Sequence, residues 1–132
     1  MDEELIQAQA AAARIACLRM TARHLKALHD SVEHASRLPA RSQWDRKAAA
    51  HADIFRLLAD VADDPVLAPV LSGGAGSVHR LMLTVGRGAD GMIAGSRQRL
   101  LAHLRARDAE EAALEMEKHL RGLHYMWRLT RR

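Results

Sequence analysis

Hydrophobic residues recur every three or four positions along most of this chain, and that spacing predicts α-helices. No stretch alternates apolar and polar residues with the period of two expected for a strand, so we expect no β-sheet. The first helix is predicted over about residues 2–18. The apolar stripes of the later helices span Leu25–Ala35, His51–Ala62, Val66–Leu71, Val78–Val85, Ile93–Leu104 and Ala112–Met126.

Three helix starts are marked by residue types that cap helices. Thr21 is expected to cap the second helix, because its hydroxyl oxygen can accept a hydrogen bond from a free backbone N–H. Ser42 with Asp45, and Asp108 with Glu111, have the spacing of a capping residue and an acidic third position. These two pairs predict the starts of the third and the last helix.

Prolines and glycines divide the middle of the chain. Asp64–Pro65 predicts a helix start, because aspartate caps helices and proline suits the first helical position; Pro69 is expected to kink that helix. The stretch SGGAGS at residues 72–77 predicts either a loop or a break between two short helices. GRGADG at residues 86–91 predicts a second flexible connection, which lacks the strand and the Lys-Ser/Thr pair of a phosphate-binding loop.

Composition favours one all-α domain over residues 1–132. A chain of 132 residues is near the size of one domain with one core. Aromatic residues make up only 3% of it, so aliphatic residues and methionine must fill that core, and the abundant alanine, leucine and arginine favour helices. The single Cys17 excludes an internal disulfide, and the absence of a secretory leader points to the cytoplasm. No apolar run approaches the ~18 residues of a membrane span.

The basic residues are spread along the chain rather than gathered in one place. The formal charge is +4, from 20 Lys and Arg against 16 Asp and Glu. Nucleic-acid binding needs a basic face or groove, and only Arg128 with Arg131 and Arg132 resembles a cluster, which we interpret as a solvated end. Catalysis is not expected either, because there is no serine elbow, no base beside Cys17 and no pair of inward carboxylates.

Three polar side chains fall on the inward stripes of the predicted helices. His51 shares its stripe with Phe55, Arg97 lies on the stripe of the penultimate helix, and His119 lies on that of the last. Such histidines can be core residues with satisfied ring nitrogens, and an arginine can extend along its apolar stem to solvent. The spacing alone does not decide between these structural roles and a binding site.

Three segments carry a resemblance to a known family. They read AAARIACLRMTARHLKALHDSVEHA, HADIFRLLADVADDPVL and SRQRLLAHLRARDAEEAALEMEKHL. In this order they resemble the C-terminal effector-binding domain of FadR-like regulators in the GntR superfamily, called the FCD domain. The resemblance covers about residues 10–120 and is most specific over Asp108–Leu120. It implies an antiparallel bundle of about six or seven helices around a central ligand pocket, joined to a winged helix-turn-helix that binds operator DNA.

The resemblance also implies positions for a divalent metal, held in many members by one Asp and three His side chains. At those positions this sequence has His51, Phe55, Arg97 and His119. Only His119 is retained, while His51 is a substitution still able to coordinate. Two imidazoles facing a guanidinium do not supply the three or more ligands that a zinc-like ion needs, so we expect no metal cofactor. A metal module using His51, His119 and Asp53 is the weaker alternative.

Arg97 leads to the main hypothesis about function. A permanently charged guanidinium at the metal's position would receive a carboxylate or phosphate of a small effector directly. His51 and His119 would hydrogen-bond to this ligand, and Phe55 would form an apolar wall. Besides the metal module, a helical domain that acts only through protein contacts is a competing interpretation.

The same resemblance implies the partners of such a domain. It favours a homodimer in the cytoplasm, without a membrane partner and without enzyme activity. A winged helix-turn-helix needs ~60–70 residues before the effector domain, and residues 1–132 leave no room for it. We therefore expect operator DNA to be contacted only through a separate N-terminal domain.

Overall fold

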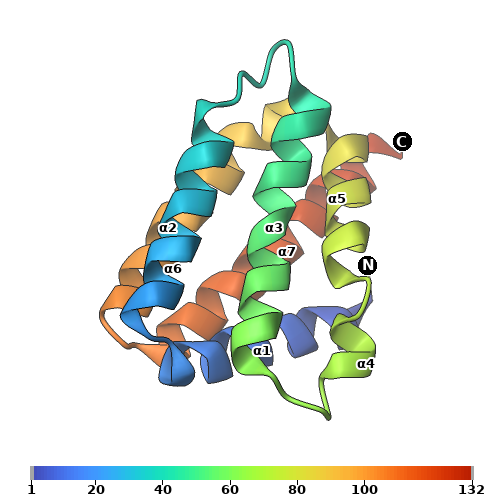
Figure 1. The fold of residues 1–132 in the computed structure, drawn as a ribbon. Helices are drawn as coiled ribbons and strands as arrows, with labels where there is room; N and C mark the ends of the chain where they lie inside the picture. The colour runs from blue at the N-terminus through green and yellow to red at the C-terminus, as the bar shows by residue number, and fades with distance from the viewer. Residues whose placement is uncertain (1, 132) are drawn as a thin grey trace.

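The computed structural model describes residues 2–131 and consists of seven α-helices and one short 3-10 helix (Figure 1). No strand occurs within these residues, so the prediction of an all-α fold with six or seven helices is confirmed. No helix among them is long and apolar enough to cross a membrane. The elements are α1 (Glu3–Arg19), α2 (Ala22–Arg37), α3 (Trp44–Ala62), α4 (Ala68–Leu71), α5 (Gly74–Val85), η1 (Arg87–Ala89), α6 (Asp90–Arg105) and α7 (Ala109–Thr130).

The helices form an antiparallel bundle with α3 at its centre. In Figure 1, α2, α3, α5, α6 and α7 alternate in direction, and α1 crosses the lower end of the bundle. α3 packs against α1, α2 and α5, while α7 packs against α1, α5 and α6. The core is filled mainly by Leu, Ala, Ile, Val and Met, and Phe55 is the only fully buried Phe, Trp or Tyr among the described residues. α3 therefore packs against helices on several of its sides.

Two of the predicted helix starts are confirmed. The hydroxyl of Thr21 accepts a hydrogen bond from the backbone N–H of His24 at 3.2 Å, and Nδ1 of His24 accepts one from the N–H of Thr21 at 3.1 Å. This reciprocal pair closes the start of α2. At the start of α7, Oδ1 of Asp108 accepts from the N–H of Glu111 at 3.2 Å.

The predicted cap at Ser42 is wrong. α3 begins at Trp44, Gln43 precedes it, and no side chain caps this end. The first residue of α3 is instead tied to another helix, because the indole N–H of Trp44 donates to the carbonyl oxygen of Met82 in α5 at 3.2 Å. A contact between distant helices is thus found at this start in place of a local capping pattern.

The segment after Asp64 begins with a turn rather than with the predicted helix. Oδ1 of Asp64 accepts from the N–H groups of Val66 at 2.8 Å and Leu67 at 3.2 Å, so this aspartate does cap the chain locally. α4 starts only at Ala68. Pro69 lies in its first turn, where a helix needs no N–H donor, and therefore does not kink it.

The glycine-rich stretch at residues 72–77 forms a break between two short helices, one of the two predicted outcomes. Gly73 has a φ of 80°, a left-handed conformation that favours glycine, and α5 begins at the next residue. Gly74 packs so closely on α1 that an added Cβ would lie 2.6 Å from Nε2 of Gln9. The second glycine-rich stretch, at residues 86–91, forms η1 and the start of α6.

The C-terminal ends of three helices are closed by cationic side chains from elsewhere in the fold. The buried Lys47 of α3 donates from Nζ to three carbonyl oxygens at the end of α2, at 2.7 to 3.3 Å. Arg19 donates to the Ala62 carbonyl at the end of α3, and Arg107 donates to the Cys17 carbonyl in α1 at 3.1 Å. Helix C-termini carry unpaired carbonyls and partial negative charge, so these contacts fix how the helices meet.

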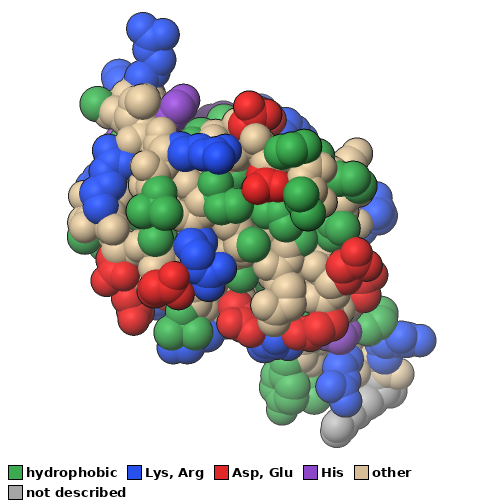
Figure 2. Space-filling model, turned by 90° about the horizontal axis from the view of Figure 1, so that it is seen from below, with side chains coloured by type: hydrophobic (Ala, Val, Ile, Leu, Met, Phe, Trp, Pro, Cys, Tyr) green, Lys and Arg blue, Asp and Glu red, His purple; other side chains and the backbone are tan. Residues whose placement is uncertain are grey.

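The outer face of α1 and α7 is joined by ion pairs. Arg121 in α7 lies 2.6 Å from Glu3 and 2.9 Å from Glu117, and Arg14 in α1 lies 2.9 Å from Glu110. On the face seen in Figure 2, Lys and Arg side chains are mixed with Asp and Glu side chains. This agrees with the dispersed charge of the sequence.

We predict that Lys47→Met lowers the free energy of unfolding by about 2–4 kcal/mol, because it leaves the buried carbonyl oxygens at the end of α2 without their donor. Urea denaturation followed by circular dichroism measures this change. Lys26→Met is the matched control, since its ion pair with Asp30 is exposed and contributes at most about 0.5 kcal/mol. Equal stabilities of the two variants would refute this role for Lys47.

Candidate functional site

The inward polar residues predicted from the sequence meet at the centre of the bundle. His51 and Phe55 come from α3, Arg97 from α6 and His119 from α7. Exposed fractions are 3% for His51, 1% for Phe55, 2% for Arg97 and 3% for His119. Arg97 therefore does not extend to solvent. The alternative in which its guanidinium reaches the surface is excluded.

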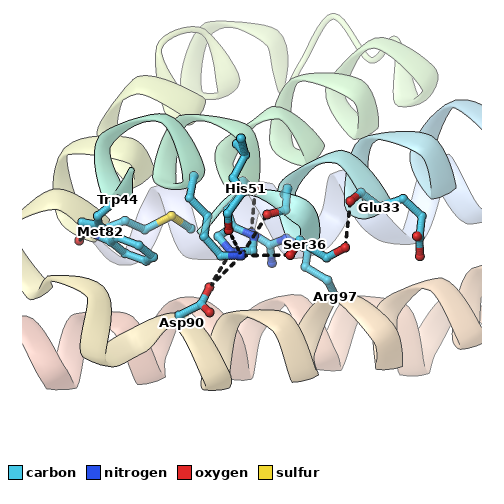
Figure 3. Close-up of polar contacts among 10 residues, drawn as sticks. Glu33, Ser36, Trp44, His51, Met82, Asp90 and Arg97 are labelled. Atoms are coloured by element: carbon cyan, nitrogen blue, oxygen red, sulfur yellow. Dashed lines mark hydrogen bonds and ion pairs between the residues drawn. The ribbon is translucent and has the colours of Figure 1, made fainter. Parts of the chain in front are cut away.

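Arg97 is a buried cation with few polar contacts. Its Nη2 donates to the backbone carbonyl oxygen of His51 at 2.8 Å (Figure 3). Its Cζ lies 5.2 Å from the centre of the Phe55 ring. Nε and Nη1 have no hydrogen-bond partner among residues 2–131. Burial lowers the pKa of Arg97 to about 9, with Glu115 opposing this effect, so the guanidinium stays charged at neutral pH.

His119 lies beside the same aromatic ring. The two rings are stacked, with centres 6.1 Å apart and planes inclined by 20°. Neither ring nitrogen of His119 has a hydrogen-bond partner in the described chain. Burial, and then the charge of Arg97, hold the pKa of His119 well below its usual range, so this imidazole is neutral.

His51 is fixed by a carboxylate at the start of α6. Its Nε2 lies 3.0 Å from Oδ1 of Asp90, which is also 3.7 Å from Nζ of Lys47 (Figure 3). Burial lowers the pKa of His51 to about 4 even though Asp90 opposes the shift. The neutral ring therefore carries its proton on Nε2 and donates it to Asp90. Nδ1 is left without a partner among the described residues.

Glu115 of α7 links this helix to α6 through a second set of polar contacts. Glu115 is buried, and its carboxylate accepts from the hydroxyl of Ser96 at 3.0 Å and from Nε of Arg99 at 2.8 Å. Glu115 lies one helical turn before His119 in α7. Its charge is thus bound to Arg99 at the surface, and it forms no ion pair with Arg97 within residues 2–131.

Sequence reasoning missed Lys47, Asp90 and the role of Glu115. Each of them had a signal in the sequence, because each lies on the same helix face as a residue that was predicted. Lys47 precedes His51 by four residues, Glu115 precedes His119 by four, and Asp90 precedes Arg97 by seven. Extending the inward stripes by one or two turns would have found them.

The metal ion that the family resemblance implies does not fit these residues. Within residues 2–131, no group of three or more His, Cys, Asp or Glu side chains is placed to hold one. Phe55 has no ligand atom, and Nε2 of His51 is bound to Asp90. The charge of Arg97 would in addition repel a cation.

Asp53, the third ligand considered in the metal alternative, lies away from this centre. Its carboxylate pairs with Arg56 at 2.9 Å on the exposed side of α3. The described residues therefore offer two neutral imidazoles and one guanidinium, a set suited to an anion rather than to a cation.

The family model for the FCD domain matches residues 9–122, which is most of the chain. The chain belongs to the FCD domain family. The resemblance drawn from the sequence is thus confirmed, and FCD domains are the C-terminal regulatory domains of GntR-family transcription regulators rather than enzymes. Comparisons with curated proteins and with solved structures gave no match.

The central residues of this FCD domain border two spaces of very different size. Beside Arg97, between α2, α3 and α6, a narrow space is lined by Ser31, His51 and apolar side chains, and it is nowhere wide enough for a water molecule. On the other side, Phe55 lines an open groove of about 870 Å³ between α3, α4 and the start of α5. The guanidinium therefore lies in a closed centre next to a large surface groove.

We predict that the stability of the domain depends on pH through its buried neutral histidines. The folded pKa of His119 is below the unfolded value, so the unfolded state binds more protons and stability falls as the pH drops below about 6.5. His119→Leu removes this contribution. The stability of the native chain relative to this variant should decrease by up to about 1.4 kcal/mol per pH unit between pH 6.5 and 4.

Chemical denaturation at several pH values measures that difference. His34→Leu, on the exposed face of α2, is the control and should follow the native chain at each pH. If His119→Leu also runs parallel to the native chain, the imidazole of His119 does not stay neutral in the folded state.

Proposed function

We propose that this FCD domain is the ligand-sensing domain of a GntR-family regulator and that it binds a small carboxylate or phosphate at Arg97. The observation that supports this proposal is the buried guanidinium of Arg97, whose Nε and Nη1 have no partner among the described residues. A positive charge inside a helical bundle is costly unless an anion accompanies it. An acidic effector would provide that anion.

The neighbouring side chains suit the rest of such a ligand. A carboxylate or phosphate accepts the planar pair of N–H groups that arginine presents. His119 and Nδ1 of His51 have hydrogen-bonding capacity that no described residue uses. Phe55 would then cover the apolar part of the effector, as in ligand sites with a few polar groups in an apolar wall.

Binding at this place would couple the effector to the arrangement of the helices. Arg97 belongs to α6, while the carbonyl group and the aromatic ring that it contacts belong to α3. An anion that draws the guanidinium away from the His51 carbonyl would change how α3 and α6 pack, and a ligand that prefers one packing shifts the population toward it. In the full regulator, a cytoplasmic homodimer, this shift would alter the placement of the winged helix-turn-helix domains on operator DNA.

We predict that an effector acid raises the melting temperature of the native chain and that Arg97→Met removes the shift. A ligand that binds only the folded state adds about 2.7 kcal/mol of stability at one hundred times its Kd. Differential scanning fluorimetry against small organic acids, sugar acids, acyl-CoAs and inorganic phosphate measures the effect.

Two features make the variant informative. Arg97→Met replaces a buried charge with an apolar side chain of similar length, so its free energy of unfolding without ligand should stay within about 1 kcal/mol of the native value or exceed it. Arg105→Met, at an exposed position of the same helix, should keep the full ligand response. An acid that stabilises Arg97→Met as much as the native chain would show that the effector binds elsewhere.

A further inference from the structure

Phe55 takes part in both the closed centre and the open groove. Its ring is 5.2 Å from Cζ of Arg97 and is stacked with the ring of His119. The same residue lines the groove of about 870 Å³, together with Ala59, Leu71 and Ala75. Phe55 itself is 1% exposed. The Phe55 side chain thus lies between the unpartnered guanidinium and this groove.

The difference in size between the space beside Arg97 and the groove means that Phe55 limits the size of a ligand bound at Arg97. The space beside Arg97 does not admit a water molecule, whereas the groove holds about 870 Å³ and is open to solvent. With Phe55 in place, an acid can reach Arg97 only by displacing side chains, so a bound acid must be small. A larger acid needs the volume of the Phe55 ring, which lies against the guanidinium on one side and lines the groove on the other.

We infer that Phe55 is the residue that limits the size of the acid this domain accepts, by separating the Arg97 site from the groove between α3, α4 and α5. This inference rests on the proposed anion site at Arg97. It adds that the route to the site runs through the groove, so that removing the ring lets an acid bind with its carboxylate at Arg97 and its apolar body in the groove.

The lining of the groove indicates what kind of body would fit there. Alanine, leucine and proline side chains form much of its wall. Three carboxylates, those of Asp60, Asp63 and Asp64, lie along it with one cation, Arg56, which is already paired with Asp53. A second acidic group would be repelled by these carboxylates. The ligand class for the opened site is therefore an aromatic or branched monocarboxylic acid rather than a diacid.

The test uses benzoate and phenylacetate, whose rings match the side chain removed in Phe55→Ala. Isothermal titration calorimetry should give an affinity for these acids at least tenfold higher in Phe55→Ala than in the native chain. Adding Arg97→Met to Phe55→Ala should abolish the gain. Toluene, which has the ring but no carboxylate, should not distinguish Phe55→Ala from the double variant.

Leu58→Ala is the matched control, because Leu58 is equally buried in α3 but does not line the groove. Should Phe55→Ala fail to fold, Phe55→Val opens the same connection with a smaller loss of core volume, and its gain should appear for the smaller pivalate. Equal gains in Leu58→Ala, a gain that survives Arg97→Met, or no gain in either Phe55 variant would overturn the inference.

The two proposals fail differently in this experiment. If small acids stabilise the native chain through Arg97 but the Phe55 variants gain nothing, only the role of Phe55 is refuted. If no acid binds the native chain or any variant through Arg97, the anion site itself is refuted, and the inference with it.

Discussion

The candidate site is organised around the buried guanidinium of Arg97, which forms no ion pair within the described residues. A low-dielectric interior disfavours such a charge, and its effects are visible in the groups around it. The pKa of Arg97 itself is lowered by burial, and its charge contributes to the low pKa values of His51 and His119. Both imidazoles are therefore neutral, and of the four residues His51, Phe55, Arg97 and His119 only Arg97 carries a charge.

The helices around this centre are held by contacts that do not depend on it. Lys47, Arg19 and Arg107 close the C-terminal ends of α2, α3 and α1. Ion pairs between α1 and α7 join the outer face. Because these contacts and the aliphatic core fix the scaffold, the centre can keep unpartnered donors that a ligand would use. This separation of scaffold from site is consistent with a regulatory domain that exchanges ligands.

Much of this arrangement could be predicted from the sequence, and the failures have identifiable causes. The inward positions of His51, Phe55, Arg97 and His119 follow from helical periodicity, since position along a stripe determines the face. The start of α3 could not be predicted, because no side chain caps it and its first residue is hydrogen-bonded to Met82 in a distant segment. The partner of Arg97 was equally out of reach: it is the backbone carbonyl of His51 rather than its ring, and this depends on how α3 and α6 are aligned.

The central claim is that a charged Arg97 inside the bundle is the receptor for an acidic effector. Nitrogen-15 NMR of arginine side chains tests it most directly, with the Arg97 Nε–H signal assigned by its loss in Arg97→Lys. The account predicts a signal that exchanges slowly with water at neutral pH and moves on titration with an acid that stabilises the fold, while the signals of exposed arginines stay in place. An Arg97 signal that exchanges as fast as those of exposed arginines, or that stays unchanged while the acid binds, would contradict the account.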